Sequence, residues 1–366
     1  MFCERVKNID ISGIRKMFEG AGPNAINLGL GQPDFDTPEH IKKAAIDAIN
    51  NGFTAYTVNL GIPELREALC RKFERENHFT VMPDEVMITS GASEALHLAL
   101  VALIDRGDDV LIPDPGFVSY SALTRMAGGR AVGVPLGEGL TVRPEEVNES
   151  ITPRTKVLII NSPSNPTGTV QREHEIKALA EIAEDNGITI ISDEVYEHFI
   201  YEGEHISPAQ FTDNVITING VSKTYAMTGW RIGYAAARKE YIEQMLKVHQ
   251  YIQACANSIA QKAAQAAIEG PQDCVSEMRA SFRARRDVLL EGLCAMGIKC
   301  IRPEGAFYAF PEIEDEDAPQ RLIENGIIVV PGTAFGENGK GHIRISYSTS
   351  IENIRRALGI MEKVLC

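Results

Sequence analysis

Runs of β-branched and aliphatic residues alternate with helical patterns along the first two thirds of the chain. The runs stand in the segments DDVLIPDPGFVSY, TKVLIINSPSNPTG, GITIISDEVY and DNVITINGVSK, and each ends in an abrupt polar turn. Helical patterns of suitable length lie between several of them, as at His174–Asn186. Continuous apolar strands that alternate with helices are typical of a mostly parallel sheet covered on both faces. The pattern therefore predicts an α/β fold.

Two helices are expected before the first of these strands. Thr37 is the expected N-cap of the first helix and Pro38 its first residue, and the helix is expected to end near Asn51 and Gly52. Pro63 is expected to open the second helix.

A short strand, a turn of small residues and a helix are predicted next. Val86–Thr89 is the strand, and Ser90–Ser93 leads into an apolar helix from Glu94. Small residues at a helix start leave backbone N–H groups free to face an anion, and the helix dipole favours negative charge there. A plain serine N-cap explains this segment equally well when it is read alone.

The pattern of predicted elements changes from about Lys239. Long helical segments lead to a shorter region that contains GAFYAFP, IIVVPGTAFG and HIRISYSTS. A length of 366 residues also suggests about two domains. We expect an N-terminal segment (1–35) that associates with the small domain or a dimer partner, a large domain (36–260), and a smaller C-terminal α+β domain (261–366).

Composition narrows the class of protein. Apolar content is 44% and charged content 23%, and both are ordinary for a globular protein. The formal net charge of −14 argues against nucleic acid or an anionic membrane surface as a partner. The seven cysteines are scattered without a CxxC pair, and no stretch reaches the roughly 18 apolar residues of a membrane span. We expect a cytoplasmic protein without a metal site.

The stretch Asn219–Tyr234 contains several candidate functional residues close together and reads NGVSKTYAMTGWRIGY. Its lysine, Lys223, follows the apolar run VITI in a turn of small residues. A lysine amine in this position can be desolvated and its pKa lowered, as a Schiff-base lysine requires. Ser222 and Arg231 add a hydroxyl donor and a planar cation, a pair suited to a phosphate.

Three of the predicted strands end in polar residues of complementary type, Asn165, Asp193 and Lys223. Ligands of open α/β sheets bind beyond the carboxyl ends of the strands, so these side chains are expected to meet. The apolar residues before Asp193 and Glu194 also resemble the Walker B motif of an ATPase. The chain contains no GxxxxGK[ST] phosphate loop, which argues against an ATPase.

The stretch around Lys223 resembles the lysine segment of the class I/II aminotransferases, which are pyridoxal-phosphate (PLP) enzymes of fold type I. The resemblance extends in order from about Leu28 to about Gly359. It implies a large PLP-binding domain with a central sheet sandwiched by helices, and a smaller α+β domain. It also implies that Lys223 forms a Schiff base with the cofactor, with Lys223, Asp193 and Tyr196 as the catalytic residues.

The resemblance assigns the other cofactor contacts position by position. Asp193 corresponds to the carboxylate that keeps the pyridine nitrogen protonated, so that the ring can withdraw electrons. Asn165 and Tyr196 correspond to the partners of the ring oxygen, and Phe117 to the aromatic residue that stacks on the ring. The phosphate cup is assigned to Ala92, Ser93, Ser222 and Arg231.

Two further assignments concern the substrate and the partner subunit. Arg344 in HIRISYS corresponds to the arginine for the substrate α-carboxylate, and a guanidinium can bind a carboxylate through two parallel hydrogen bonds. Asn165 and Gly31 correspond to residues that complete this contact. Tyr56 is similar to a tyrosine that reaches the phosphate of the neighbouring subunit, which implies a homodimer with shared active sites.

The implied activity is ping-pong transfer of an amino group between an L-amino acid and a 2-oxo acid. Aspartate and 2-oxoglutarate are the expected pair, and aromatic amino acids or alanine are the alternatives. A PLP-dependent C–S β-lyase is the nearest other activity. A non-catalytic PLP-binding regulator usually needs an attached DNA-binding module, for which this acidic chain has no spare N-terminal length.

Three positions depart from well-known aspartate-specific relatives. Some of those relatives have a lysine at the position of Ser93 and a threonine near Ile14, and both contact the distal carboxylate. Phe117 stands where the best-known aspartate enzymes have tryptophan. These departures leave the side-chain specificity open.

Overall fold

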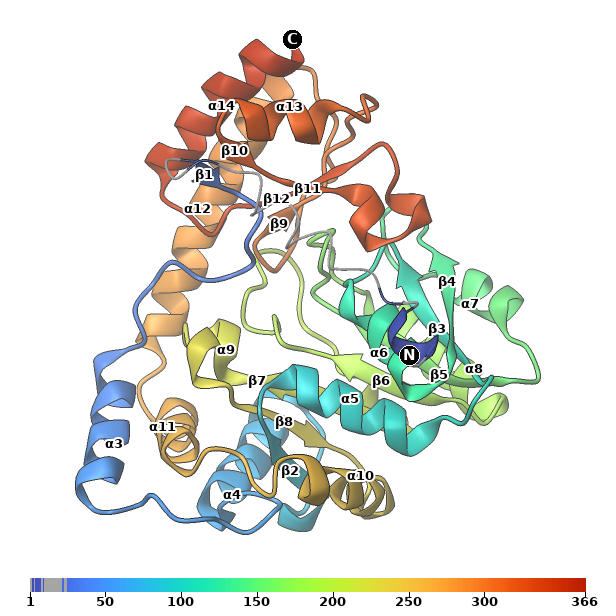
Figure 1. Cartoon of the computed structure of the whole chain (residues 1–366), viewed down its shortest axis with the longest axis vertical. Helices are drawn as coiled ribbons and strands as arrows, with labels where there is room; N and C mark the ends of the chain where they lie inside the picture. Colours follow the sequence, from blue (N-terminus) through green and yellow to red (C-terminus); the bar gives the residue numbers. More distant parts are fainter. Residues whose placement is uncertain (1, 3, 8, 10–21, 23–24) are drawn as a thin grey trace.

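Two parts of unequal size make up the structure, and one long helix, α12 (Asp273–Ala295), runs along both of them (Figure 1). The computed structural model describes residues 2, 4–7, 9, 22 and 25–366. The larger part is built on a seven-stranded sheet. The smaller part contains two short sheets and the C-terminal helices.

The central sheet has the strand order β2-β8-β7-β6-β5-β3-β4. The strands are β2 (Val86–Thr89), β3 (Asp109–Asp114), β4 (Arg130–Pro135), β5 (Thr155–Asn161), β6 (Thr189–Asp193), β7 (Val215–Gly220) and β8 (Gly233–Ala236). Strand β8 is antiparallel to both neighbours, and all other pairs are parallel. The mostly parallel sheet predicted from the apolar runs is confirmed.

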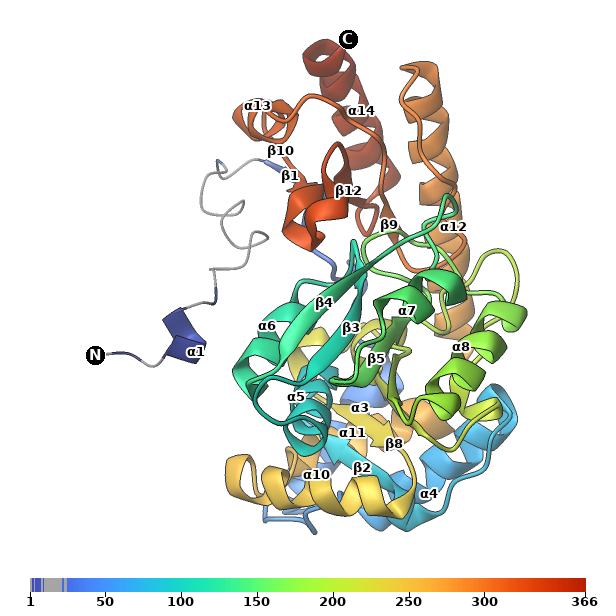
Figure 2. The same cartoon turned by 90° about the vertical axis from the view of Figure 1, so that its right-hand side faces the viewer.

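Alternate side chains of each strand pack on opposite faces of the sheet, as the period of two requires. In β5, Val157 and Ile159 face helices α5, α6 and α10, whereas Leu158 and Ile160 face α7 and α8 (Figure 2). Near β2 and β8 the second face is covered by α4 and α11, with α3 outside α11. These helices are α3 (Glu39–Asn50), α4 (Pro63–Lys72), α5 (Ala92–Leu103), α6 (Ser119–Ala127), α7 (Pro144–Ser150), α8 (Glu173–Asp185), α10 (Lys239–Ile252) and α11 (Ser258–Glu269).

The predicted cap of helix α3 is wrong by one residue. Pro38 is the N-cap residue and the helix begins at Glu39, without a capping side-chain hydrogen bond. The Thr37 hydroxyl instead donates to the carbonyl oxygen of Ala226 (2.8 Å) and accepts a hydrogen bond from the Trp230 indole (3.0 Å). Thr37 therefore ties the start of α3 to the turn that follows Lys223.

The small part surrounds a core that segments from both ends of the chain share. Strand β1 (Ile26–Asn27) pairs in parallel with β10 (Ile327–Ile328), so the N-terminal segment joins the C-terminal region. The remaining elements are β9 (Tyr308–Ala309), β11 (Val330–Pro331), β12 (Ile343–Ser346), α13 (Ala318–Glu324) and α14 (Ile351–Leu365). Strands β11, β12 and β9 form an antiparallel sheet in that order, and the short helix α1 (Glu4–Lys7) lies against α6 (Figure 2).

The expected boundary between residues 260 and 261 falls inside helix α11. Buried alanines of α11, among them Ala260, Ala263 and Ala264, pack in the core beneath β2 and β8. The boundary stays a prediction, and this packing favours a position between α11 and α12. None of the described helices is long and apolar enough to cross a membrane.

A buried ionic network lies under the carboxyl end of the sheet. The Lys72 amine pairs with Glu197 and donates to Asn77 Oδ1 (2.6 Å), and Asn219 donates to Glu197 at 2.7 Å. These contacts lower the pKa of Glu197 to about 2 against the opposing effect of burial, mainly through the charge of Lys72. Glu194 is also fully buried.

The same network contains a group of metal-ligand type, formed by Glu194, Glu197 and His205, whose ligand atoms lie within 4.8 Å of one another. Glu194 already accepts hydrogen bonds from His205 (2.8 Å) and Ser207 (2.6 Å), and the Lys72 ammonium already balances Glu197. Hydrogen bonds and a resident cation therefore engage these carboxylates. The expectation of no metal site stays a prediction.

Replacing Lys72 with methionine should destabilise the protein strongly, because it leaves Glu197 buried without its cation. Breaking a buried pair costs about 3–5 kcal/mol of unfolding free energy. Glu197 is held at a lowered pKa, so the stabilisation is complete above about pH 4.5, its ordinary value, and is lost as the pH falls toward 2. Urea denaturation followed by the fluorescence of Trp230, the single tryptophan, measures the change.

The matched control is Lys340→Met, which removes an exposed ion pair with Glu316. It should leave the unfolding transition almost unchanged. Equal losses in the two variants would contradict the role of the buried pair.

Candidate active site

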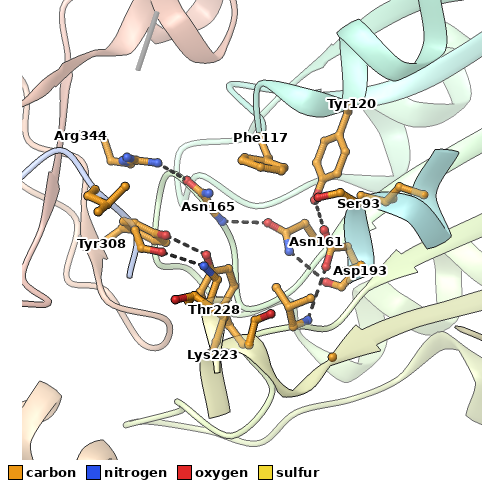
Figure 3. A pocket seen from close by; sticks show the side chains of 18 of the residues that line it. Ser93, Phe117, Tyr120, Asn161, Asn165, Asp193, Lys223, Thr228, Tyr308 and Arg344 are labelled. Carbon is orange, nitrogen blue, oxygen red and sulfur yellow. Dashed lines mark hydrogen bonds between the residues drawn. The ribbon is translucent and has the colours of Figure 1, made fainter. Parts of the chain in front are cut away.

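A cavity of about 260 Å³ opens at the carboxyl end of the central sheet, between the two parts of the molecule (Figure 3). It is lined by Leu30, Gly31, Ala92, Ser93, Leu96, Phe117, Tyr120, Asn161, Asn165, Asp193, Val195, Tyr196, Gly220, Ser222, Lys223, Thr228, Arg231, Tyr308 and Arg344. Every candidate site residue named from the sequence except Tyr56 is among them. The side chain of Tyr56 is 88% exposed on the single chain.

Lys223 lies on a one-turn helix, α9 (Val221–Thr224), directly after strand β7. Its amine donates a hydrogen bond to the carbonyl oxygen of Gly31 at 2.7 Å. Burial lowers the pKa of Lys223 to about 8, and the positive charges of Arg344 and Arg231 act in the same direction, against Asp193. At pH 8 about half of these amines are neutral and nucleophilic.

Asp193 is the last residue of β6 and is 4% exposed. Its Oδ2 accepts a hydrogen bond from the Tyr120 hydroxyl at 2.8 Å, and its backbone oxygen accepts one from Asn161 at 2.9 Å. Burial raises the pKa of Asp193 to about 6, although the Tyr120 hydrogen bond lowers it. A cation close to this carboxylate would remove the cost of keeping it charged.

The predicted end of strand β5 is wrong by four residues. The strand ends at Asn161, and Asn165 lies in the following turn, where its backbone N–H donates to Asn161 Oδ1 at 2.8 Å. Asn161 is therefore the residue beside Asp193. Asn165 instead points toward Arg344 and accepts a hydrogen bond from its Nη1 at 3.0 Å (Figure 3).

Arg344 of β12 is a buried cation that has no counter-ion among the described residues. It is 1% exposed, and none of the described carboxylates forms an ion pair with it. Its Nη2 donates to the carbonyl oxygen of Gly29, whereas its Nε has no hydrogen-bond partner. Burial lowers the pKa of Arg344. A buried guanidinium in this state has the charge and the donors that suit a carboxylate.

The cup that the sequence assigns to a phosphate lies where helix α5 begins. Gly91 precedes the helix at φ +85°, and a Cβ on it would lie 2.2 Å from Arg231 Nη2. A Cβ on Gly233 would lie 2.4 Å from the backbone nitrogen of Ala92, so both positions need glycine. Arg231 itself has φ +55°, and its Nη1 donates to the Thr228 carbonyl oxygen at 3.1 Å.

These groups fit the chemistry of pyridoxal phosphate. The cup offers helix N–H groups, hydroxyls and a guanidinium for a phosphate. Asp193 offers a buried carboxylate for a pyridinium, and Lys223 an amine for an aldehyde. Phe117 and Lys223 lie on opposite sides of the cavity in Figure 3, which leaves room for a flat ring between them.

Four lining residues with polar side chains were not found from the sequence: Tyr120, Asn161, Thr228 and Tyr308. Tyr120 stands three residues after Phe117, and its spacing was a usable signal because one helical turn places both on the same side. Asn161 ends an apolar run, which was also a signal. Tyr308 belongs to a two-residue strand, and no local pattern marks it. Position 14, considered for distal-carboxylate binding, lies outside the described residues.

The chain is similar to proteins of known family along its whole length. The family model for aminotransferase class I and II matches residues 23–360. A relative from Methanocaldococcus jannaschii, described as a probable aspartate aminotransferase, is 50% identical over 100% of both chains. The aspartate/prephenate aminotransferase of Thermus thermophilus is 46% identical and covers 94% of this chain and 92% of its own.

The solved structure of aspartate aminotransferase from Thermus thermophilus with maleate superposes with a TM-score of 0.96. It is 42% identical, and the match covers 100% of both chains. The fold type I architecture expected from the resemblance is thereby confirmed. The chain belongs to the class I and II aminotransferases and is a pyridoxal-phosphate-dependent aminotransferase.

Proposed function

We propose that Lys223, Asp193 and Arg344 carry out amino transfer in the cavity between the two parts of the molecule. The observation that carries the proposal is a set of three groups that open to one space: a buried amine with a lowered pKa, a buried carboxylate, and a buried guanidinium whose Nε has no hydrogen-bond partner among the described residues. Bound pyridoxal phosphate supplies a ring that withdraws electrons from the substrate Cα. The side chains described above supply binding, orientation and proton transfer.

Each residue has a distinct part in this proposal. Lys223 Nζ would take the proton from the substrate Cα and deliver it to the cofactor carbon, because its lowered pKa lets it act as both base and acid. Asp193 keeps the ring nitrogen protonated, and Tyr196 and Asn165 bind the ring oxygen. Arg344 binds the α-carboxylate through two parallel hydrogen bonds.

The remaining contacts hold the phosphate and the ring in place. Ala92, Ser93, Ser222 and Arg231 bind the phosphate, and Phe117 packs on the ring. Gly31 and Asn165 complete the contact of Arg344 with the carboxylate. After the first oxo acid leaves, a second enters the same site, which gives ping-pong kinetics.

Aspartate and 2-oxoglutarate are the proposed substrates. The names of the relatives support this choice, and so does the maleate in the Thermus structure, because maleate is a dicarboxylate. The relatives' names also favour amino transfer over the β-lyase alternative. The described residues that line the cavity include three cations, Lys223, Arg231 and Arg344. Each of them already has a proposed partner in the cofactor or in the substrate α-carboxylate.

Aromatic amino acids are the second candidate substrates. Leu30, Leu96 and Phe117 give the cavity an apolar side, and the lining has Ser93 in place of a distal-carboxylate lysine. A flat side chain would gain from burial against this side.

The working unit is proposed to be a homodimer. Tyr56, Val58, Tyr251 and Ile252 are 54–88% exposed, although they are large and apolar. Their two loops lie side by side, because Asn59 donates to the carbonyl oxygen of Ala254. Adjacent exposed apolar residues of this kind mark protein interfaces. Tyr56 would then reach the phosphate cup of the partner. A cytoplasmic location stays a prediction.

A half-reaction screen tests the proposed function. Holoenzyme is mixed with one amino acid and no oxo acid, and loss of the cofactor's visible absorbance is followed. Aspartate should react faster than phenylalanine, tyrosine or alanine, and Lys223→Ala should be at least about 100-fold slower because a positioned acid–base group is removed. Faster reaction with phenylalanine or tyrosine would establish the second candidate. Release of pyruvate and ammonia without an acceptor would overturn amino transfer.

Replacing Arg344 with lysine should lower kcat/KM at least roughly tenfold, because one charged hydrogen bond is worth about 1.5–3 kcal/mol. Steady-state kinetics with the preferred amino acid measure the loss. The control is Arg302→Lys, since Arg302 is an exposed arginine that pairs with Glu202 and Asp287 and does not line the cavity. If Arg344→Lys matches wild type, Arg344 does not bind the substrate.

Replacing Tyr56 with phenylalanine should raise the dissociation constant for pyridoxal phosphate about tenfold, since a hydroxyl-to-phosphate hydrogen bond is lost. The effect can arise only through a partner, because Tyr56 does not line the cavity of its own chain. Equilibrium dialysis of the cofactor measures it, and light scattering should give twice 40.1 kDa. Tyr251→Phe, equally exposed, is the control. A monomer in solution would contradict the shared site.

A further inference from the structure

Tyr308 lies between the proposed cofactor contacts and the proposed carboxylate site. It is the first residue of β9, which pairs with β12, the strand that carries Arg344. Its side chain is 1% exposed and lines the cavity. Figure 3 places its ring beside the Arg344 guanidinium, on the side of the cavity that faces Lys223.

The hydroxyl of Tyr308 is held at one defined point. It lies 2.7 Å from the hydroxyl of Tyr196, and both residues are buried. A Cβ on Gly31 would lie 1.9 Å from the Tyr308 hydroxyl oxygen, so this position accepts only glycine unless the tyrosine moves. The carbonyl oxygen of the same Gly31 accepts the hydrogen bond from Lys223.

The aromatic ring of Tyr308 packs against Arg344. The guanidinium carbon of Arg344 lies 4.6 Å from its centroid, and Phe335 flanks the same guanidinium at 4.9 Å. A buried guanidinium over an aromatic face gains a cation–π attraction without using its N–H donors. The two rings therefore hold Arg344 in place without occupying its N–H donors, of which Nε has no partner among the described residues.

We propose that Tyr308 is a positioning residue with two separable functions. Its hydroxyl donates to Tyr196 and strengthens the hydrogen bond that Tyr196 makes to the cofactor's ring oxygen. Its ring face orients Arg344 for the substrate carboxylate. The inference rests on the proposed roles of Tyr196 and Arg344, and it extends them to a residue that touches both.

The charge on the cofactor's ring oxygen decides whether the Tyr308 hydroxyl raises or lowers the pH at which the holoenzyme titrates. The charged groups that face the tyrosine pair are Arg344 on β12, Asp193 on β6 and Lys223 on α9. When the lysine-bound cofactor loses its proton, negative charge stays on the ring oxygen, and a hydrogen-bond donor favours that form. A donor to Tyr196 makes Tyr196 a stronger donor in turn. Tyr308 therefore lowers the pH at which the holoenzyme titrates.

Spectroscopic titration of the holoenzyme and maleate binding separate the two functions. In Tyr308→Phe the midpoint of the visible absorbance change should rise by roughly 0.2–0.7 pH units, because a cooperative part of one hydrogen bond is lost. The dissociation constant for maleate should change less than about twofold, because the ring remains. Tyr308→Met removes both the hydroxyl and the aromatic ring. The midpoint should therefore rise, and the maleate dissociation constant should increase about threefold to thirtyfold. Tyr308→Leu provides a second ring-free variant should the methionine variant not fold.

Tyr347→Phe is the matched control, because Tyr347 is a buried tyrosine of the same core that does not line the cavity. It should leave both readouts unchanged. An unchanged midpoint in Tyr308→Phe overturns the hydroxyl function, and wild-type maleate affinity in the ring-free variants overturns the ring function. A failure of the proposed function looks different, since wild-type holoenzyme would then lack the visible band that Lys223→Ala removes.

Discussion

An excess of positive charge in the cavity is the constraint on which the site depends. Lys223, Arg231 and Arg344 share the lining with one buried carboxylate, Asp193. Desolvation makes this excess costly, and the cost is visible in the lowered pKa values of Lys223 and Arg344. A phosphate, a pyridinium ring and a carboxylate would relieve the imbalance at separate points. The cavity is thus complementary to the sum of cofactor and substrate rather than to either alone.

The structure holds these charges apart by placing them on different rigid elements. Asp193 and Glu194 are consecutive, yet Asp193 faces the cavity and Glu194 faces the buried network that contains Lys72. Tyr196, two residues later, belongs to the core of the small part and packs edge-on against Phe307. One short segment after β6 therefore connects the sheet, the ionic network and the second core. Rigid supports of this kind keep catalytic groups in a productive geometry.

The central architecture was predictable from the sequence because local patterns dictate it. Apolar runs and polar turns located strands β2, β5, β6 and β7 and the residues near their carboxyl ends. The family resemblance supplied the residues that converge on the cavity. Errors arose where a nonlocal contact overrides a local rule. Thr37 bonds Trp230 instead of capping α3, and three residues of the turn after β5 separate Asn161 from Asn165. Tyr308 was missed because its importance comes only from pairing with β12.

The floor of the anion cup is made of backbone, since Gly91 and Gly233 touch neighbouring groups so closely that neither can carry a side chain. Single substitutions at these two glycines therefore cannot change the shape of the floor. A redesign for a cofactor analogue with a larger or neutral tail would have to work from the rim, at Ser93, Ser222 or Arg231. The rim is adaptable and the floor is not, so the backbone beneath the proposed phosphate site is the part of the cavity that substitutions can change least.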